Sequence, residues 1–228
     1  MNRLFKLSLL TLLTGFVSTV IGVFGRSQIP FHASYSAQFD HLSQVQTSNL
    51  AAYAFRHSFH GSQIQLISDL GPRDDRYDLR AIDTLILHHE GAIGMAHHAK
   101  ERSQNHEIQA LAQQMLEEHQ QQRSQLQQWR QSWYQAAPNI PIGWSTALEQ
   151  PSAMSIEQMK KIQMVQDLNV ALHHYDRHFL TAMLHHHQGG LYLKHQILNK
   201  VQRPTLQHYL QTALDATLQE VHNLQGQV

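Results

Sequence analysis

The sequence contains an internal repeat with an offset of 98 residues, and this repeat restricts the fold more than any other feature. Two histidine pairs mark its copies, His88 with His89 and His186 with His187. Other identical residues recur at the same offset: Asp69 and Asp167, Tyr77 and Tyr175, Asp78 and Asp176, and Gly91 and Gly189. Apolar positions recur as well, and no insertion is needed from about residue 57 to 130. The chain is therefore predicted to contain a duplicated unit.

Apolar residues around both histidine pairs recur at helical spacing, which predicts long helices rather than strands. In the first copy we expect helices over residues 57–70, 74–103 and 107–135, with Gly71 and Pro72 separating the first two. In the second copy we expect a long helical stretch over 155–200 that bends near Asn169, and a last helix that begins at Pro204.

Prolines at 138, 141 and 151 predict an irregular linker between the copies. At its end, Ser155 and Gln158 form a predicted capping box, with Met154 and Met159 as a hydrophobic staple. The expected organisation is an N-terminal segment 1–25, an extension 26–56 with a short helix, a first repeat 57–135, a linker 136–154 and a second repeat 155–228. Two helical hairpins pack naturally as a four-helix bundle, so the predicted fold class is all-α, with extra short N-terminal helices.

The composition excludes several classes of function. Acidic and basic residues number 17 each, and without a basic block the chain is not expected to bind nucleic acid. Cysteine is absent, which excludes disulfides, thiolate metal sites and a lipoprotein anchor. The unusual excess is 19 histidines.

The N-terminal segment has the pattern of an export signal. Arg3 and Lys6 precede an uncharged run over residues 7–25, and Arg26 follows it. The run has a poor cleavage site and is close to the ~20 residues that span a bilayer, so an uncleaved inner-membrane anchor is the alternative. Either reading places the remaining chain in the periplasm or outside the cell.

Helical phase separates the members of each histidine pair. At about 100° per residue, His89 and His187 fall at the centre of the apolar stripes of their helices, and His88 and His186 fall on the flanks. Because a duplicated bundle has a pseudo-twofold axis, His89 and His187 are expected to approach one another inside it. The constellation predicted around them adds Met183, with Met115 and His119 on the inward stripe of another helix.

These residue types indicate a transition-metal site. Imidazole suits copper, zinc, iron or nickel, and thioether sulfur selects copper, particularly Cu(I). Because ligation requires neutral imidazole, binding should weaken as the pH falls through roughly 6. The alternative from the residues alone is that His89 and His187 are core histidines hydrogen-bonded to carboxylates or backbone.

The order of residues around each pair carries a resemblance. An aspartate stands ten residues before the pair, and an acidic or amide residue and a glycine follow it: Asp78, His88, His89, Glu90 and Gly91, then Asp176, His186, His187, Gln188 and Gly189. Met183 stands three residues before His186, and Trp129 and Trp133 close the first copy. Over roughly residues 55–228 this order resembles the bacterial family known as domain of unknown function 305.

The resemblance implies a ferritin-like four-helix bundle and a copper-binding role, as in exported cyanobacterial members implicated in copper resistance. It implies these ligand candidates: His88, His89, His186, His187, Met183 and Met95. Asp78 and Asp176 become second-shell or helix-start groups, and Glu90 a second-shell group.

The chain departs from the family pattern at several sulfur positions. Leu85 replaces the methionine before the first histidine pair, and Leu126 replaces the one near the tryptophans. His119 and Gln122 stand where the family has Gln and Glu. Fewer sulfur ligands and more imidazoles favour Cu(II) or zinc more than in a methionine-rich relative.

The leading prediction is a non-catalytic protein that binds or sequesters copper outside the cytoplasm, with no protein partner assigned. A ferritin-like di-metal oxidoreductase is the first alternative, but its chemistry needs Glu-x-x-His motifs, and the sequence has none. A helical module without metal is the second.

Overall fold

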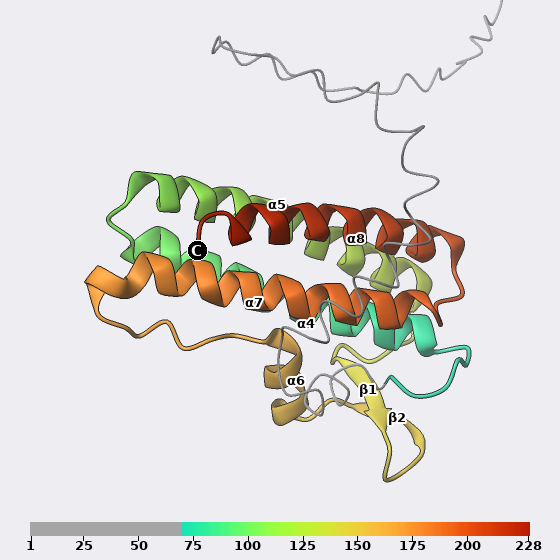
Figure 1. Ribbon diagram of the computed structural model, residues 1–228. Coiled ribbons are helices and arrows are strands. Elements are labelled where there is room, and N and C mark those ends of the chain that lie inside the picture. The colour runs from blue at the N-terminus through green and yellow to red at the C-terminus, as the bar shows by residue number, and fades with distance from the viewer. Residues whose placement is uncertain (1–69) are drawn as a thin grey trace, which may run out of the picture. The chain divides into compact units, whose positions relative to one another are not determined.

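The computed structural model describes residues 70–228, so the predicted helix over 57–70, the short helix before it and the N-terminal run 7–25 lie outside the described residues. Four long helices lie side by side (Figure 1): α4 (Tyr77–Arg102), α5 (His106–Trp133), α7 (Leu172–Leu198) and α8 (Pro204–Gln225). Packing within the α4–α5 and α7–α8 hairpins and between α4 and α7 produces the bundle. The predicted all-α fold is confirmed. No helix among these residues is both long and apolar enough to span a membrane.

The linker contains more regular structure than its prolines predict. A two-stranded antiparallel hairpin, β1 (Ile142–Ser145) and β2 (Gln150–Ala153), follows α5. Asp83 of α4 holds this hairpin in place, because its carboxylate accepts a hydrogen bond from the Ile142 amide at 2.8 Å and pairs with Arg130. The expectation of an irregular connection is wrong here, because contacts with residues far away in the sequence hold the two strands in place.

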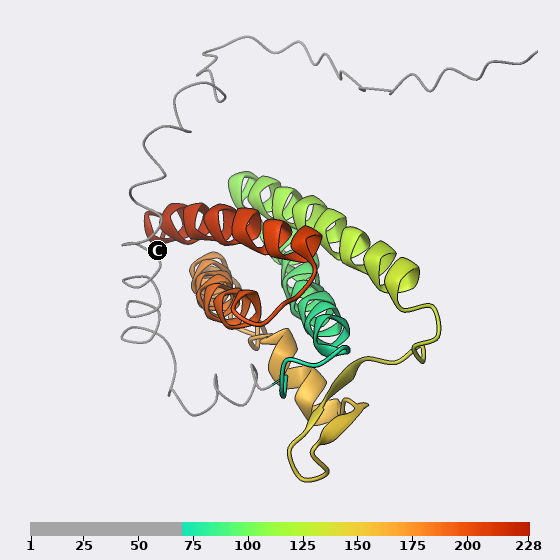
Figure 2. The same cartoon turned by 90° about the vertical axis from the view of Figure 1, so that its right-hand side faces the viewer.

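Helix α6 (Ile156–Gln163) begins at the predicted capping box, with Ser155 and Gln158 bonded reciprocally. Met154 and Met159 pack in one apolar cluster with Leu87 and Ile162, as expected for a staple. The chain then leaves the helix at Met164, which has a left-handed φ of 49°, and α7 begins only at Leu172. The predicted bend is therefore a complete break. Figure 2 shows α6 and the strands on one side of the bundle, where both contact α4.

Contacts between the two hairpins repeat with the sequence. Asp78, at the start of α4, accepts backbone hydrogen bonds from Gln202 and Arg203, in the turn of the second hairpin. Asp176, near the start of α7, accepts a side-chain hydrogen bond from the Ser103 hydroxyl in the turn of the first hairpin, at 2.6 Å. Two basic residues at equivalent positions also make equivalent contacts. Arg102 donates a hydrogen bond to the Val170 carbonyl and lies 5.8 Å from the centroid of the Tyr175 ring. Lys200 donates one to the Gly71 carbonyl and lies 5.8 Å from the centroid of the Tyr77 ring. The duplication is thus visible as reciprocal contacts.

Besides the small cluster beside α6, two larger apolar clusters form the core, one toward each end of the bundle. One cluster contains Tyr77, Ile82 and Leu85 at the start of α4, and the other contains Ala92, Met95 and Ala99 further along the same helix. The apolar residues of α5, α7 and α8 are likewise divided between the two clusters according to their position along each helix. Buried polar side chains occupy the level between the clusters, and the histidine pairs lie there.

Candidate metal centre

Helices α4 and α7 bring the two histidine pairs together in the middle of the bundle. At most 2% of any of the four residues is exposed. The rings of His88 and His186 stack with centroids 4.1 Å apart and planes inclined by 1°. The prediction that these two residues occupy the flanks is wrong, because they are the pair that meets between the repeats.

Glycines explain why the predicted flank is buried. A methyl group on Gly91 would lie 1.9 Å from the carbonyl oxygen of Gln163, so only glycine lets the end of α6 approach α4 this closely. A methyl group on Gly190 would lie 2.5 Å from His88 Nε2. Close approach of the α6 backbone to α4, and of the His88 ring to α7, therefore covers the side of each helix that periodicity within one helix assigns to the flank.

His89 and His187 do not meet directly but lie on either side of His119 of α5. The ring centroid of His119 is 5.3 Å from each of them. Nδ1 of His89 lies 3.0 Å from Nδ1 of His119, and Tyr209 Oη lies 3.3 Å from Nε2 of His89. Two protonated rings cannot share an Nδ1 contact, so at least one of His89 and His119 must be neutral.

Burial keeps most of this cluster neutral. Desolvation holds the pKa of His88, His89, His119 and His186 well below the ordinary value of a histidine, because the charged form would lose its hydration. The charges of neighbouring histidines and of Lys194 add to this effect. Around His186, the backbone of Met164 and His88 acts in the opposite direction without outweighing burial. Neutral imidazole is the form that binds metals.

Three buried ring nitrogens of the stacked pair form no hydrogen bond of normal geometry: Nδ1 of His88 and both Nδ1 and Nε2 of His186, although backbone groups of Met164 and His88 lie near the His186 ring. Leaving a buried polar atom unsatisfied costs about 1–3 kcal/mol. A bound cation would satisfy lone pairs at these positions, so the residues present fit the imidazole site that the sequence predicts.

The predicted sulfur ligands gather on one side of the histidines. Met95, Met115 and Met183 belong to the same apolar cluster, and none is more than 5% exposed. Met115 and Met183 lie one helical turn before His119 and His187. Met183 also fixes the orientation of the His187 ring, because its carbonyl oxygen accepts a hydrogen bond from Nδ1 of His187 at 2.8 Å.

The predicted second-shell carboxylates do not lie beside the imidazoles. Asp78 and Asp176 precede the histidine pairs by ten residues, or about 15 Å of helix. Their contacts are those at the helix starts, with the turns of the opposite hairpins. Glu90 is half-buried and, within the described part of the chain, forms no hydrogen bond or ion pair with the five imidazoles.

Sequence reasoning missed two charged residues of the candidate site. Glu220 of α8 places Oε2 2.9 Å from Nε2 of His187. Lys194 of α7 is 2% exposed and donates a hydrogen bond to Oγ1 of Thr217 at 2.8 Å. Burial lowers the pKa of Lys194 to about 8, while the charge of Glu220 raises it. The signal for Lys194 was its spacing, because it follows His187 by seven residues and so lies on the same helix face.

The side chains do not converge on one point as they stand. Among residues 70–228, no group of three or more His, Asp or Glu side chains has its donor atoms arranged around one ion. Parallel stacking of His88 and His186 directs their nitrogen lone pairs side by side rather than toward each other. One ring must rotate about its Cβ–Cγ bond for both to bind the same ion.

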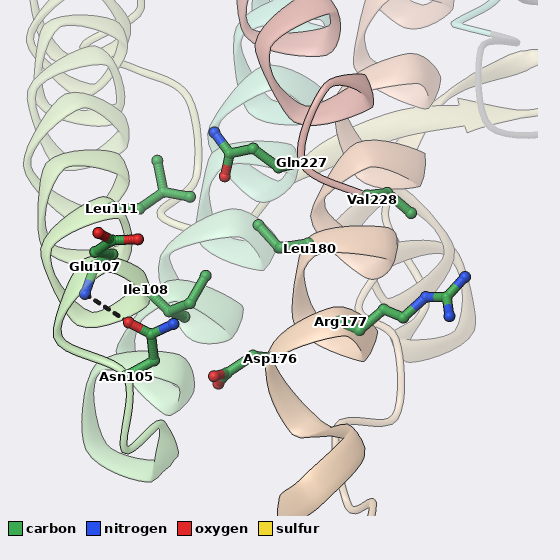
Figure 3. A pocket seen from close by; sticks show the side chains of 9 residues that line it. All are labelled: Asn105, Glu107, Ile108, Leu111, Asp176, Arg177, Leu180, Gln227 and Val228. Atoms are coloured by element: carbon green, nitrogen blue, oxygen red, sulfur yellow. Dashed lines mark hydrogen bonds between the residues drawn. The ribbon is translucent and has the colours of Figure 1, made fainter.

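A separate pocket of about 640 Å³ lies between α5, α7 and the C-terminal residues (Figure 3). Asn105 and Glu107 at the start of α5, Asp176 near the start of α7 and the C-terminal Val228 contribute to its walls. None of its lining residues is a histidine or methionine, so it is distinct from the candidate metal centre.

The fold and the cluster define a four-helix bundle made of two equivalent hairpins with a buried layer of imidazoles between them. The family model described as "Domain of unknown function (DUF305)" matches residues 78–228, and the chain belongs to this family. This membership confirms the resemblance seen in the sequence.

Solved structures with detectable similarity include two of CopM, described as the Cu(II)-bound and Cu(I)-bound forms. They are 19% and 18% identical to this chain, with TM-scores of 0.49 and 0.48. The matches cover 64% and 65% of this chain and 90% and 93% of theirs. A DUF305 protein from Streptomyces coelicolor is 17% identical, with a TM-score of 0.48, over 65% of this chain and 89% of its own. Comparison with curated proteins finds no match.

Proposed function

We propose that this protein binds and sequesters copper in the periplasm or outside the cell, without catalysing a reaction. The observation that carries the proposal is the stacked, buried pair of His88 and His186, three of whose nitrogens form no hydrogen bond of normal geometry within the described residues. Burial that keeps these rings neutral also keeps their lone pairs available to a metal ion.

Copper is the ion that the surrounding donors favour. Imidazole binds Cu(I), Cu(II) and Zn(II), while the nearby thioethers of Met115 and Met183 favour Cu(I). Zinc is the second ion that imidazoles of this kind accept. Location outside the cytoplasm rests on the export pattern of residues 1–26.

The test is a competition titration of metal-free protein with Cu(I), Cu(II) and Zn(II). We expect the His88→Ala/His186→Ala variant to lose at least tenfold in copper affinity. The matched control is His173→Ala/His174→Ala, which removes another touching pair, with centroids 3.9 Å apart, that is exposed at the start of α7. If wild type binds no ion, or if only the control variant loses affinity, the buried cluster serves packing and the proposal fails.

A further inference from the structure

The contact between His187 and Glu220 brings two hydrogen-bond acceptors together. A carbonyl oxygen can only accept, so Nδ1 of His187 must carry the hydrogen that it donates to Met183. In the neutral ring, Nε2 therefore presents a lone pair, and Oε2 of Glu220 lies 2.9 Å from it. The contact lacks the geometry of a hydrogen bond. His187 is buried and the Glu220 side chain is 23% exposed. A lone pair and a carboxylate oxygen this close repel one another unless they share a cation, either a proton or a metal ion.

We infer that Nε2 of His187 and Oε2 of Glu220 are adjacent ligands of a second metal position, suited to Cu(II), between α7 and α8. The inference rests on the proposed function, because it assigns one oxidation state of copper to one side of the same cluster.

The distance between the two atoms supports a right angle at the ion. With metal–ligand bonds of about 2.0 Å, ligands at a right angle lie about 2.8 Å apart, whereas ligands at the tetrahedral angle lie about 3.3 Å apart. The observed 2.9 Å matches the right angle. An ion on the Nε2 lone-pair axis also places the carboxylate oxygen to the side of that axis, where a direct hydrogen bond is not made. Square-planar or tetragonal nitrogen and oxygen ligands are typical of Cu(II).

His119 of α5 provides the third side chain. Its ring centroid is 5.3 Å from that of His187, and the residue is 5% exposed. Rotation of this ring about its Cβ–Cγ bond would direct a nitrogen toward the same ion. Two imidazoles and one carboxylate form a harder donor set than the methionines, so this position disfavours Cu(I).

A buried ammonium group also belongs to this side of the cluster. Lys194 donates a hydrogen bond to Oγ1 of Thr217 at 2.8 Å, so its side chain is engaged there and does not ligate.

The experiment compares wild type with Glu220→Gln in the full chain, loaded with Cu(II), Zn(II) or Cu(I). We expect Cu(II) affinity to fall 10- to 100-fold and the Cu(II) electron paramagnetic resonance spectrum to change, while Cu(I) affinity changes less than threefold. Asp215→Asn removes an exposed carboxylate five residues earlier on the same helix and should alter none of these values.

Several results would overturn the inference. If Glu220→Gln binds Cu(II) as wild type does, the pair holds a proton only; if Cu(I) affinity falls equally, Glu220 does not select the oxidation state. If circular dichroism shows that Glu220→Gln is unfolded, Glu220→His replaces it as the test variant. Histidine supplies a nitrogen ligand at the same position, so this variant must retain Cu(II) binding. Copper binding that depends on His88 and His186 but not on Glu220 defeats this inference alone, whereas absence of binding in wild type defeats the proposed function as well.

Discussion

Lys194 and Thr217 form a buried hydrogen bond that breaks the symmetry between the repeats. Nζ of Lys194 lies 2.8 Å from Oγ1 of Thr217, and the residues equivalent to them at the 98-residue offset are Ala96 and His119. The second repeat therefore carries an ammonium group where the first carries a methyl group. This positive charge contributes to the low pKa of the buried histidines of both repeats.

Removing this charge should strengthen metal binding. We expect Lys194→Met to raise copper affinity about tenfold at pH 7, equivalent to about 1.4 kcal/mol, because a cation no longer repels the incoming ion. The pKa of Lys194 is about 8, so the difference from wild type should shrink above that pH as the wild-type amine loses its proton. Competition titrations at pH 7 and pH 9 measure both effects. Weaker binding by the variant would show that the lysine supports the site instead.

Acid should destabilise the metal-free protein. Four buried histidines have pKa values well below 6.5 when folded, whereas the unfolded chain takes up protons near 6.5. Their stabilising contribution is fully present above pH 6.5 and decreases as the pH falls toward their folded values, by up to about 1.4 kcal/mol per pH unit for each. Urea unfolding at pH 8, 7, 6 and 5 measures this slope. His186→Leu should make it shallower, and equal stability at pH 7 and 5 would contradict the explanation.

Two glycines of α4 should respond oppositely to alanine. Gly91→Ala forces a methyl group against the backbone of Gln163, and we expect a loss of about 2–3 kcal/mol in the free energy of unfolding. Gly94, on the exposed side three residues later, has open space around it, so Gly94→Ala should stabilise by about 0.5–1 kcal/mol. Urea unfolding of both variants gives the comparison. A Gly91→Ala variant as stable as wild type would mean that α6 can move away without cost.

Asp78 should contribute to stability and not to metal binding. Asp78→Ala leaves the backbone amides of Gln202 and Arg203 without their acceptor, which should cost about 1–3 kcal/mol. Asp75→Ala, at an exposed position nearby, should change stability by less than about 0.5 kcal/mol. Copper affinity, measured at a temperature where both variants are folded, should equal that of wild type. A loss of affinity in Asp78→Ala would restore the second-shell role.

The helices could be predicted from sequence because their signals are local. Apolar spacing predicted α4 over 74–103 against the observed Tyr77–Arg102, and the capping box at Ser155 and the proline at 204 gave two helix starts correctly. The β1–β2 hairpin could not be predicted, because the carboxylate of Asp83, 59 residues away, anchors Ile142.

The candidate site was predicted in composition but not in arrangement. Helical phase within α4 identifies the residues that face α5, yet α7 and α6 cover another side of the same helix, and this second interface buries His88. Gly91 and its repeat partner Gly189 were the available signal, since glycine inside a helix often marks close backbone approach. The place of Glu220 depends on how α8 packs against α7, which no local pattern contains.

The reciprocal contacts of Asp78 and Asp176 have the form of an isologous interface, in which each partner offers the other the same surface. His88 and His186 stack where such an interface has its twofold axis, the place where a residue meets its own copy. The chain is thus built as a covalently joined homodimer of two-helix units. A polypeptide with one such unit would have to self-associate to form the same pair of stacked imidazoles, whereas this chain forms it at any concentration. Joining the halves also allowed each to change separately, and Thr217 in place of a second His119 is one such change.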